Sequence, residues 1–282
     1  MSEPERAPSH MSFWEHLQEL RVRLFRIIIA VLAAFAFTYE YPFGIPELLF
    51  HHAPITPMRF KLWALAQQPF LEAMARQTHQ PIASLQPWAF TSLTEPFFSL
   101  MRLSFWAAVF LAAPVVFYQL WAFIRPGLLP RERRMVIPFV FVTSACFLIG
   151  VVFAYFQAFK FLGDILFQEA AQAGLRANLH IEEYLDLFLG TTIMTGVMFE
   201  LPVLFYFLAR FRLVTARWML KYWRHATVLI VFVSAFMTPG DVVVTTIFFS
   251  AVLLGLYFIS VLVAWIAEPR KQKDAEITIE PE

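Results

Sequence analysis

Six long runs of apolar residues, nearly free of Asp, Glu, Lys and Arg, alternate with polar segments along the chain. The runs are apolar on all sides and lack the alternation that marks the strands of a membrane barrel. A backbone in lipid must satisfy its own hydrogen bonds, and a helix needs about 20 residues to cross the hydrocarbon core. The pattern therefore predicts an all-α, polytopic membrane protein with six transmembrane helices. The runs cover residues 27–43, 103–124, 135–159, 187–209, 226–240 and 242–267.

The polar segments predict how the rest of the chain is organised. Ser12-Phe13-Trp14-Glu15 has the spacing of a capping box, so an amphipathic helix is expected to start near Ser12 and to merge with the first span. Four acidic and four basic residues precede that span, which we expect to be retained as an anchor rather than cleaved as a signal peptide. The predicted parts are a cytoplasmic N-terminal helix (1–26), a membrane domain (27–267) with external caps (44–95 and 160–186), and a flexible tail (268–282).

Two local features concern the side of the membrane domain that carries the caps. On this side, the tryptophans and tyrosines Trp63, Trp88, Tyr155 and Tyr184 are typical of an aromatic belt at the membrane interface. The fifth run is short, because the 14 residues between Arg224 and Pro239 span only roughly 21 Å as a helix. The hairpin of the fifth and sixth helices therefore presents a mismatched edge that a partner helix could cover.

Composition and charge narrow the function. Hydrophobic residues make up 59% of the chain and charged residues 15%, against about 25% charged in soluble domains. This excludes an ordinary cytosolic enzyme, and a net charge of +1 excludes a nucleic-acid binder. Of the 22 Lys and Arg residues, 16 lie in the two terminal segments and in the loops 124–134 and 210–224. Because basic residues favour the inner side, both termini are predicted to be cytoplasmic.

The motifs of common enzymes are missing, and one intramembrane acid needs a reason. No glycine is followed by lysine, and no His-Glu-x-x-His motif occurs, so neither a nucleotide loop nor a zinc-protease helix is expected. We expect no catalytic residue, cofactor or metal. Glu200 lies within the fourth run, two residues before Pro202, where a carboxylate costs at least about 2.5 kcal/mol. It either caps a kink at Pro202 or carries protons, and a proton-coupled secondary transporter is the alternative function.

Several short motifs occur in order from about residue 12 to residue 266. Together they resemble the TatC family, the multispanning receptor subunit of the twin-arginine protein translocase. The motifs are His16-Leu17-x-Glu19-Leu20-Arg21-x-Arg23, Pro114…Tyr118-Gln119-x-Trp121-x-Phe123-Ile124-x-Pro126, Glu132-Arg133-Arg134, Ala154-Tyr155-Phe156, Phe199-Glu200-x-Pro202 and Pro239-x-Asp241.

The resemblance implies a glove-shaped bundle of six helices in the bacterial inner membrane, with both termini inside. It implies that the protein binds twin-arginine signal peptides of folded cargo and exports that cargo with the proton-motive force. The implied partners are the single-span proteins TatA and TatB, docked on the fifth and sixth helices, further copies of the chain and the lipid bilayer.

The resemblance also assigns residues. Glu19 and Glu132 are the carboxylates that face the signal arginines, and Arg21, Phe123, Arg133 and Arg134 belong to the same surface. Asp241 matches an acid at the external end of the last hairpin. Either Glu169 or Gln172 takes the outer polar position of the family.

Overall fold

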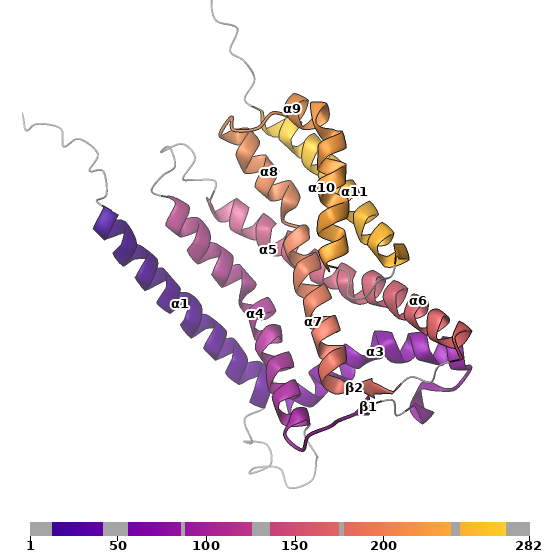
Figure 1. Cartoon of the computed structure of the whole chain (residues 1–282). Coiled ribbons are helices and arrows are strands. Elements are labelled where there is room, and N and C mark those ends of the chain that lie inside the picture. The colour runs from indigo at the N-terminus through magenta and orange to yellow at the C-terminus, as the bar shows by residue number, and fades with distance from the viewer. Residues whose placement is uncertain are drawn as a thin grey trace, which may run out of the picture. The chain divides into compact units, whose positions relative to one another are not determined.

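The computed structural model describes residues 13–41, 56–85, 88–125, 136–174, 178–237 and 243–268, and it is helical almost throughout (Figure 1). Within these residues all six predicted apolar runs are helical, which confirms the all-α fold class. The chain forms two compact units, residues 1–196 and 197–282. The elements of the first unit are α1 (Phe13–Glu40), α3 (Met58–Thr78), η1 (Ile82–Ser84), β1 (Trp88–Ala89), α4 (Glu95–Ile124), α5 (Val136–Phe153), α6 (Phe159–Gln172), β2 (Leu179–His180) and α7 (Ile181–Met198), whose last residues begin the second unit. Those of the second unit are α8 (Leu201–Arg210), α9 (Ala216–Lys221), α10 (Trp223–Met237) and α11 (Val243–Ala267).

Four helical stretches of the described chain are long and apolar enough to cross a membrane. The short fifth run is confirmed, because α10 has only 15 residues, and it already includes Arg224 and His225. The first run forms the second half of α1, a helix of 28 residues whose first half carries charges. The four stretches are Glu95–Ile124, Ile137–Gln172, Ile181–Arg210 and Val243–Ala267.

In the first unit α1 packs along α4, as Figure 1 shows. The two helices run antiparallel, because the hydroxyl of Thr38 near the end of α1 donates to the carbonyl of Ser104 early in α4, at 2.8 Å. Both residues are buried, and small buried residues further along α4, Ala108 and Ala112, permit a close approach of the helices. A hydroxyl in an apolar environment must be paired, so this bond also fixes the register of the two helices.

Two of the helices are longer than the charge-free runs predicted. The second run was expected to begin at residue 103, but α4 begins at Glu95, and the third run was expected to end at residue 159, but the helix continues to Gln172. Two charges in these helices beyond the runs have partners: Arg102 pairs with Asp186, and Asp164 pairs with Arg76 of α3 at 2.9 Å. A charge therefore ends an apolar run without ending the helix.

Of the four residues expected in an interfacial belt, Tyr184 is instead buried, and Trp63, Trp88 and Tyr155 are partly buried beside it. Tyr184 is only 4% exposed, and its ring lies 4.6 Å from that of Trp88 and 6.2 Å from that of Trp63. Phe70 of α3 packs against the same rings. Aromatic pairs at these separations stabilise a core beyond the area that they bury. These residues are therefore the hydrophobic core between α3 and α7, and the two-residue parallel pairing of β1 with β2 lies beside it.

Helix α3 contains a proline that frees a backbone acceptor. Pro69 has no N–H group, so the carbonyl of Leu65, four residues earlier, has no donor in its own helix. The hydroxyl of Tyr155 donates to this carbonyl at 3.0 Å, and the hydroxyl of Tyr184 donates to the next carbonyl, that of Ala66, at 2.5 Å. Tyr155 lies in a π-helical turn, Ala154–Ala158, between α5 and α6. Two neighbouring helices thus hold α3 at the residues beside its proline.

The second unit has its own core around α11. Tyr257 of α11 is buried and donates its hydroxyl to the carbonyl of Met219 in α9, at 2.8 Å. At the other end of the same packing, the carboxylate of Glu268 accepts from the first N–H of α9, that of Ala216, at 2.6 Å, and Thr215 caps the helix at Trp218. Anions stabilise the N-terminus of a helix, so Glu268 and Thr215 fix the short helix α9 to the end of α11.

Candidate functional site

The candidate site lies where the N-terminal end of α1 meets the C-terminal end of α4. The ring of His16 stacks on the ring of Phe123, with centroids 4.3 Å apart and planes inclined by 20°. The two residues are 107 positions apart in the chain, a separation that only the antiparallel packing of α1 on α4 closes. The stack brings Phe123 next to the helix that carries Glu19.

Glu19 is held by a guanidinium one helical turn away. The Nε of Arg23 donates to Oε1 of Glu19 at 3.0 Å, and Nη2 of Arg23 donates to the same oxygen. The third nitrogen, Nη1, lies 3.5 Å from the side-chain oxygen of Gln119, which is buried on α4. Both charged side chains are largely covered, Arg23 being 17% and Glu19 19% exposed. The pair therefore lies in a less polar environment than a surface ion pair, which strengthens its attraction.

The second carboxylate oxygen of Glu19 is not used by this pair. Oε2 is buried and accepts no hydrogen bond from any residue that the structure describes. A buried carboxylate oxygen without a donor costs about 1–3 kcal/mol or more. Beside it lies a cavity of about 390 Å³ that opens along α1 and is lined by Glu15, Gln18, Glu19, Val22, Arg23 and Arg26. This end of α1 can accept a positively charged donor.

The other residues assigned to this surface fall into two groups. Arg21 is exposed on α1, and its guanidinium lies 5.8 Å from the centre of the Phe25 ring, which places it away from the Glu19–Arg23 pair. Glu132, Arg133 and Arg134 lie outside the described residues, as does Asp241. Among the described residues, the structure thus places Phe123 against the helix that carries Glu19, and leaves Arg21 on another part of the α1 surface.

Three residues of the site were not singled out as binding residues: His16, Arg23 and Gln119. The i, i+4 spacing of Glu19 and Arg23 already indicates an ion pair. The contacts of His16 with Phe123 and of Arg23 with Gln119 connect different helices. For these contacts between helices, the signal in the sequence was that all three residues lie in the motifs that resemble the TatC family.

Glu200 lies at a break in the fourth helix. α7 ends at Met198, α8 begins at Leu201, and Glu200 takes the N-terminal capping position with Pro202 just inside α8. The helix is therefore interrupted just before Pro202, whereas the kink itself stays a prediction. The side chain of Glu200 makes no capping hydrogen bond to α8. Its backbone carbonyl accepts a hydrogen bond from the N–H of Leu204, at 2.9 Å.

Glu169 and Gln172 both lie at the end of α6 and are exposed. The carbonyl of Glu169 accepts from the N–H of Ala173 at 3.0 Å as the helix ends. Both residues therefore belong to the helical stretch Ile137–Gln172, and both side chains are exposed to solvent.

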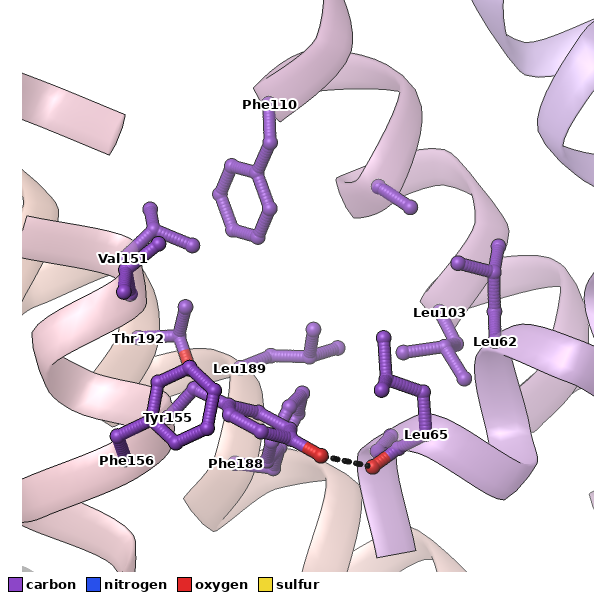
Figure 2. A pocket seen from close by; sticks show the side chains of 13 residues that line it. Leu62, Leu65, Leu103, Phe110, Val151, Tyr155, Phe156, Phe188, Leu189 and Thr192 are labelled. Atoms are coloured by element: carbon purple, nitrogen blue, oxygen red, sulfur yellow. Dashed lines mark hydrogen bonds between the residues drawn. The ribbon is translucent and has the colours of Figure 1, made fainter. Parts of the chain in front are cut away.

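An apolar cavity of about 310 Å³ lies elsewhere in the first unit (Figure 2). Residues from α3, α4, α7 and the helical stretch Ile137–Gln172 line it. Figure 2 shows Val151 on one side and Leu62 and Leu103 on the other. The hydroxyl of Tyr155 is turned to Leu65 of α3 at its edge. Such a lining suits an apolar chain rather than a polar ligand.

The chain resembles known proteins over nearly its whole length. The model of the family described as Sec-independent protein translocase protein (TatC) matches residues 15–251. The TatC protein of Koribacter versatilis is 33% identical over 270 residues, which cover 94% of this chain and 90% of that protein. The TatC protein of Desulforapulum autotrophicum is 32% identical over 274 residues, which cover 97% and 90%.

The fold is similar to a solved structure. The crystal structure of the twin-arginine translocase receptor TatC superposes with a TM-score of 0.68 and is 27% identical in sequence. The match covers 90% of this chain and 99% of that chain.

Proposed function

The chain belongs to the TatC family of Sec-independent protein translocase components, and on that premise we propose that it is the receptor for twin-arginine signal peptides. It is a multi-pass membrane protein of a translocase. The proposal rests on one observation: Glu19 is fixed by Arg23 through one carboxylate oxygen and has no donor from the described residues on the other.

The chemistry of guanidinium groups supports this proposal. An arginine presents several N–H donors in a rigid plane that matches a carboxylate, whereas a lysine ammonium is a point charge. A signal arginine would donate to Oε2 of Glu19 while Arg23 keeps Oε1 in place. Glu132 is proposed to receive the second arginine, and Arg21, Arg133 and Arg134 to contribute to the same surface, as the family resemblance implies.

The apolar part of a signal peptide requires an apolar surface. We assign it to the cavity between α3, α4 and α7, whose lining is almost entirely aliphatic and aromatic. Burial of apolar area stabilises such a complex by about 25 cal/mol per Å² before the cost of ordering the peptide. The arginines would confer selectivity, and the apolar segment would add affinity.

The sidedness and the partners belong to the same proposal. The distribution of basic residues supports a cytoplasmic position for both termini and the Glu19 surface, and the family resemblance supports the inner membrane of a bacterium. On α10 the side chains of Val228, Phe232 and Phe236 are 72%, 63% and 83% exposed. An apolar face on a helix of 15 residues suits cover by a single-span partner such as TatA or TatB. Transport is then driven by the proton-motive force. Membership of a translocase family disfavours the alternative of a proton-coupled transporter that uses Glu200.

The test is binding of a synthetic peptide that carries two consecutive arginines and an apolar segment, measured by fluorescence anisotropy with the purified full chain in detergent. Glu19→Gln removes the charge but keeps the size, and we expect affinity to fall about 10- to 100-fold, the range for a charge-assisted hydrogen bond. Glu15→Gln, in the same cavity, is the matched control and is expected to change affinity less than threefold. Equal affinities for the wild type and Glu19→Gln would contradict the role of Glu19.

A further inference from the structure

One wall of the cavity between α3, α4 and α7 is formed by α3, and this helix lacks one of its backbone hydrogen bonds there. Within α3, Pro69 leaves the Leu65 carbonyl without its helical donor. Leu62, Leu65 and Ala66, which lie just before this interruption, all line the cavity. The part of α3 that forms the wall is therefore also the part whose backbone ladder is incomplete.

The missing donor is replaced from outside the helix. The Tyr155 hydroxyl donates to the Leu65 carbonyl at 3.0 Å and the Tyr184 hydroxyl to the Ala66 carbonyl at 2.5 Å. Tyr155 comes from the helical stretch Ile137–Gln172, and Tyr184 comes from α7. Both of these helices line the cavity opposite α3. Each bond thus connects α3 to another wall of the same cavity.

We propose that Pro69, Tyr155 and Tyr184 form a latch that positions α3 as a wall of the apolar cavity and thereby sets how tightly the cavity holds an apolar peptide segment. Pro69 acts by freeing an acceptor that a regular helix would use internally. Tyr155 and Tyr184 are positioning residues, because they act on the peptide through α3. The ligand in this inference rests on the proposed function, whereas the latch itself does not.

The two tyrosines have different parts in the latch. Tyr184 is 4% exposed and is surrounded by Trp63, Phe70 and Trp88, so its ring is also a core element. Tyr155 is half-buried and itself lines the cavity, and Figure 2 shows its ring beside Phe156 with its hydroxyl bonded across to Leu65. Loss of the Tyr155 hydroxyl therefore releases α3 with little change in core packing, which makes Tyr155 the residue to vary.

The proline provides a rescue experiment. In Tyr155→Phe the Leu65 carbonyl loses its donor from Tyr155, and α3 is released at the cavity wall. Pro69→Ala supplies a backbone N–H four residues after Leu65, so the same carbonyl regains a donor within its own helix. If the hydroxyl matters only because Pro69 has freed the carbonyl, then Pro69→Ala must reverse the effect of Tyr155→Phe. Tyr118→Phe, at an exposed tyrosine of α4, is the matched control.

Two peptides are compared by fluorescence anisotropy on the full chain in detergent: one with two arginines and an apolar run, and a short one with the arginines alone. We expect Tyr155→Phe to weaken the long peptide about tenfold and the short one less than twofold. We expect Pro69→Ala/Tyr155→Phe to return to within threefold of the wild type. Equal losses for both peptides, no loss for either, or failure of the rescue would overturn the positioning role.

Hydrogen exchange of the α3 amides, measured without peptide, tests the latch independently of the proposed peptide binding. Protection of residues 65–73 is expected to fall about tenfold in Tyr155→Phe and to return in the double variant. Unchanged protection overturns the latch. If the wild type binds neither peptide, the proposed function fails while the exchange result still decides the latch. If protection follows the latch but the long peptide binds equally to all variants, the assignment of the cavity as its site is overturned.

Discussion

The two ends of the first unit treat their polar groups in opposite ways. Around Pro69, the carbonyls of Leu65 and Ala66 accept hydrogen bonds from two tyrosines, so the protein itself supplies donors for these acceptors. Around Glu19 the protein matches one oxygen and leaves the other without a donor from the described residues. A group that is fully matched contributes to stability, whereas a buried acceptor left open lowers stability and can be matched by a ligand. We therefore expect changes at the first end to affect stability and, through the position of α3, the apolar cavity, and changes at the second end to affect mainly the binding of arginine.

The largest expected effect on stability is at the matched end. Tyr184→Phe keeps the ring among Trp63 and Trp88 but removes the donor to the buried Ala66 carbonyl. The free energy of unfolding is expected to fall by about 1–1.5 kcal/mol, the upper part of the net range for one hydrogen bond, because the N–H of Phe70 remains a helical donor to the same carbonyl. Denaturant unfolding in detergent, followed by tryptophan fluorescence, measures it. A change below about 0.5 kcal/mol would mean that the helical donor alone satisfies this carbonyl.

A smaller effect is expected in the second unit, where a carboxylate is matched by a helix N-terminus. Glu268→Ala removes the acceptor for the first N–H of α9 while Thr215 continues to cap the helix. We expect a loss of about 1 kcal/mol in stability. Glu268→Gln keeps a neutral acceptor and is expected to lose about half as much, which separates the hydrogen bond from the charge. Equal losses in the two variants would show that only the charge matters.

Around Glu19, a substitution is expected to weaken peptide binding with little effect on the free energy of unfolding. Glu19→Gln is expected to change the free energy of unfolding by less than about 1 kcal/mol, since the Arg23 pair retains some exposure and a neutral acceptor remains. The same variant should weaken peptide binding, as described above. A loss of stability as large as that of Tyr184→Phe would mean that Glu19 is a structural residue and would remove the contrast between the two ends.

The smallest effect is expected for a matched pair that is exposed. Arg76 and Asp164 are 42% and 39% exposed. Arg76→Gln is expected to lower stability by only a few tenths of a kcal/mol, and less at high salt, because water and ions screen such pairs. Unfolding at two salt concentrations measures it. A salt-independent loss above about 1 kcal/mol would indicate that the pair has a role in holding α3 on α6.

Several features of the fold could be predicted from individual residues. The length of the apolar runs predicted the helices, the capping box placed the start of α1 near Ser12, and Pro202 predicted the break after Glu200. These signals are local, because they depend on residues within one or two helical turns. The apolar runs did not predict how far α4 and α6 extend beyond them, where Arg102 and Asp164 find partners on other helices.

The site was predicted in part for the same reason. The pair of Glu19 with Arg23 follows from a spacing of four residues, but the approach of Gln119 and the stack of His16 on Phe123 depend on how α1 packs along α4. Tryptophan and tyrosine suit both an interfacial belt and a core, so composition cannot distinguish them, and only the packing of the helices buried Tyr184 and set Trp88 against it.

The sequence by itself determined that this is an all-helical membrane protein, because the hydrophobic length of each run and the need to satisfy the backbone in lipid leave no other solution. The tertiary structure alone decided which polar groups meet. Hydrogen bonds act only over about 3 Å, so the donor to the Leu65 carbonyl, 90 residues away in Tyr155, exists only once two distant helices have packed together.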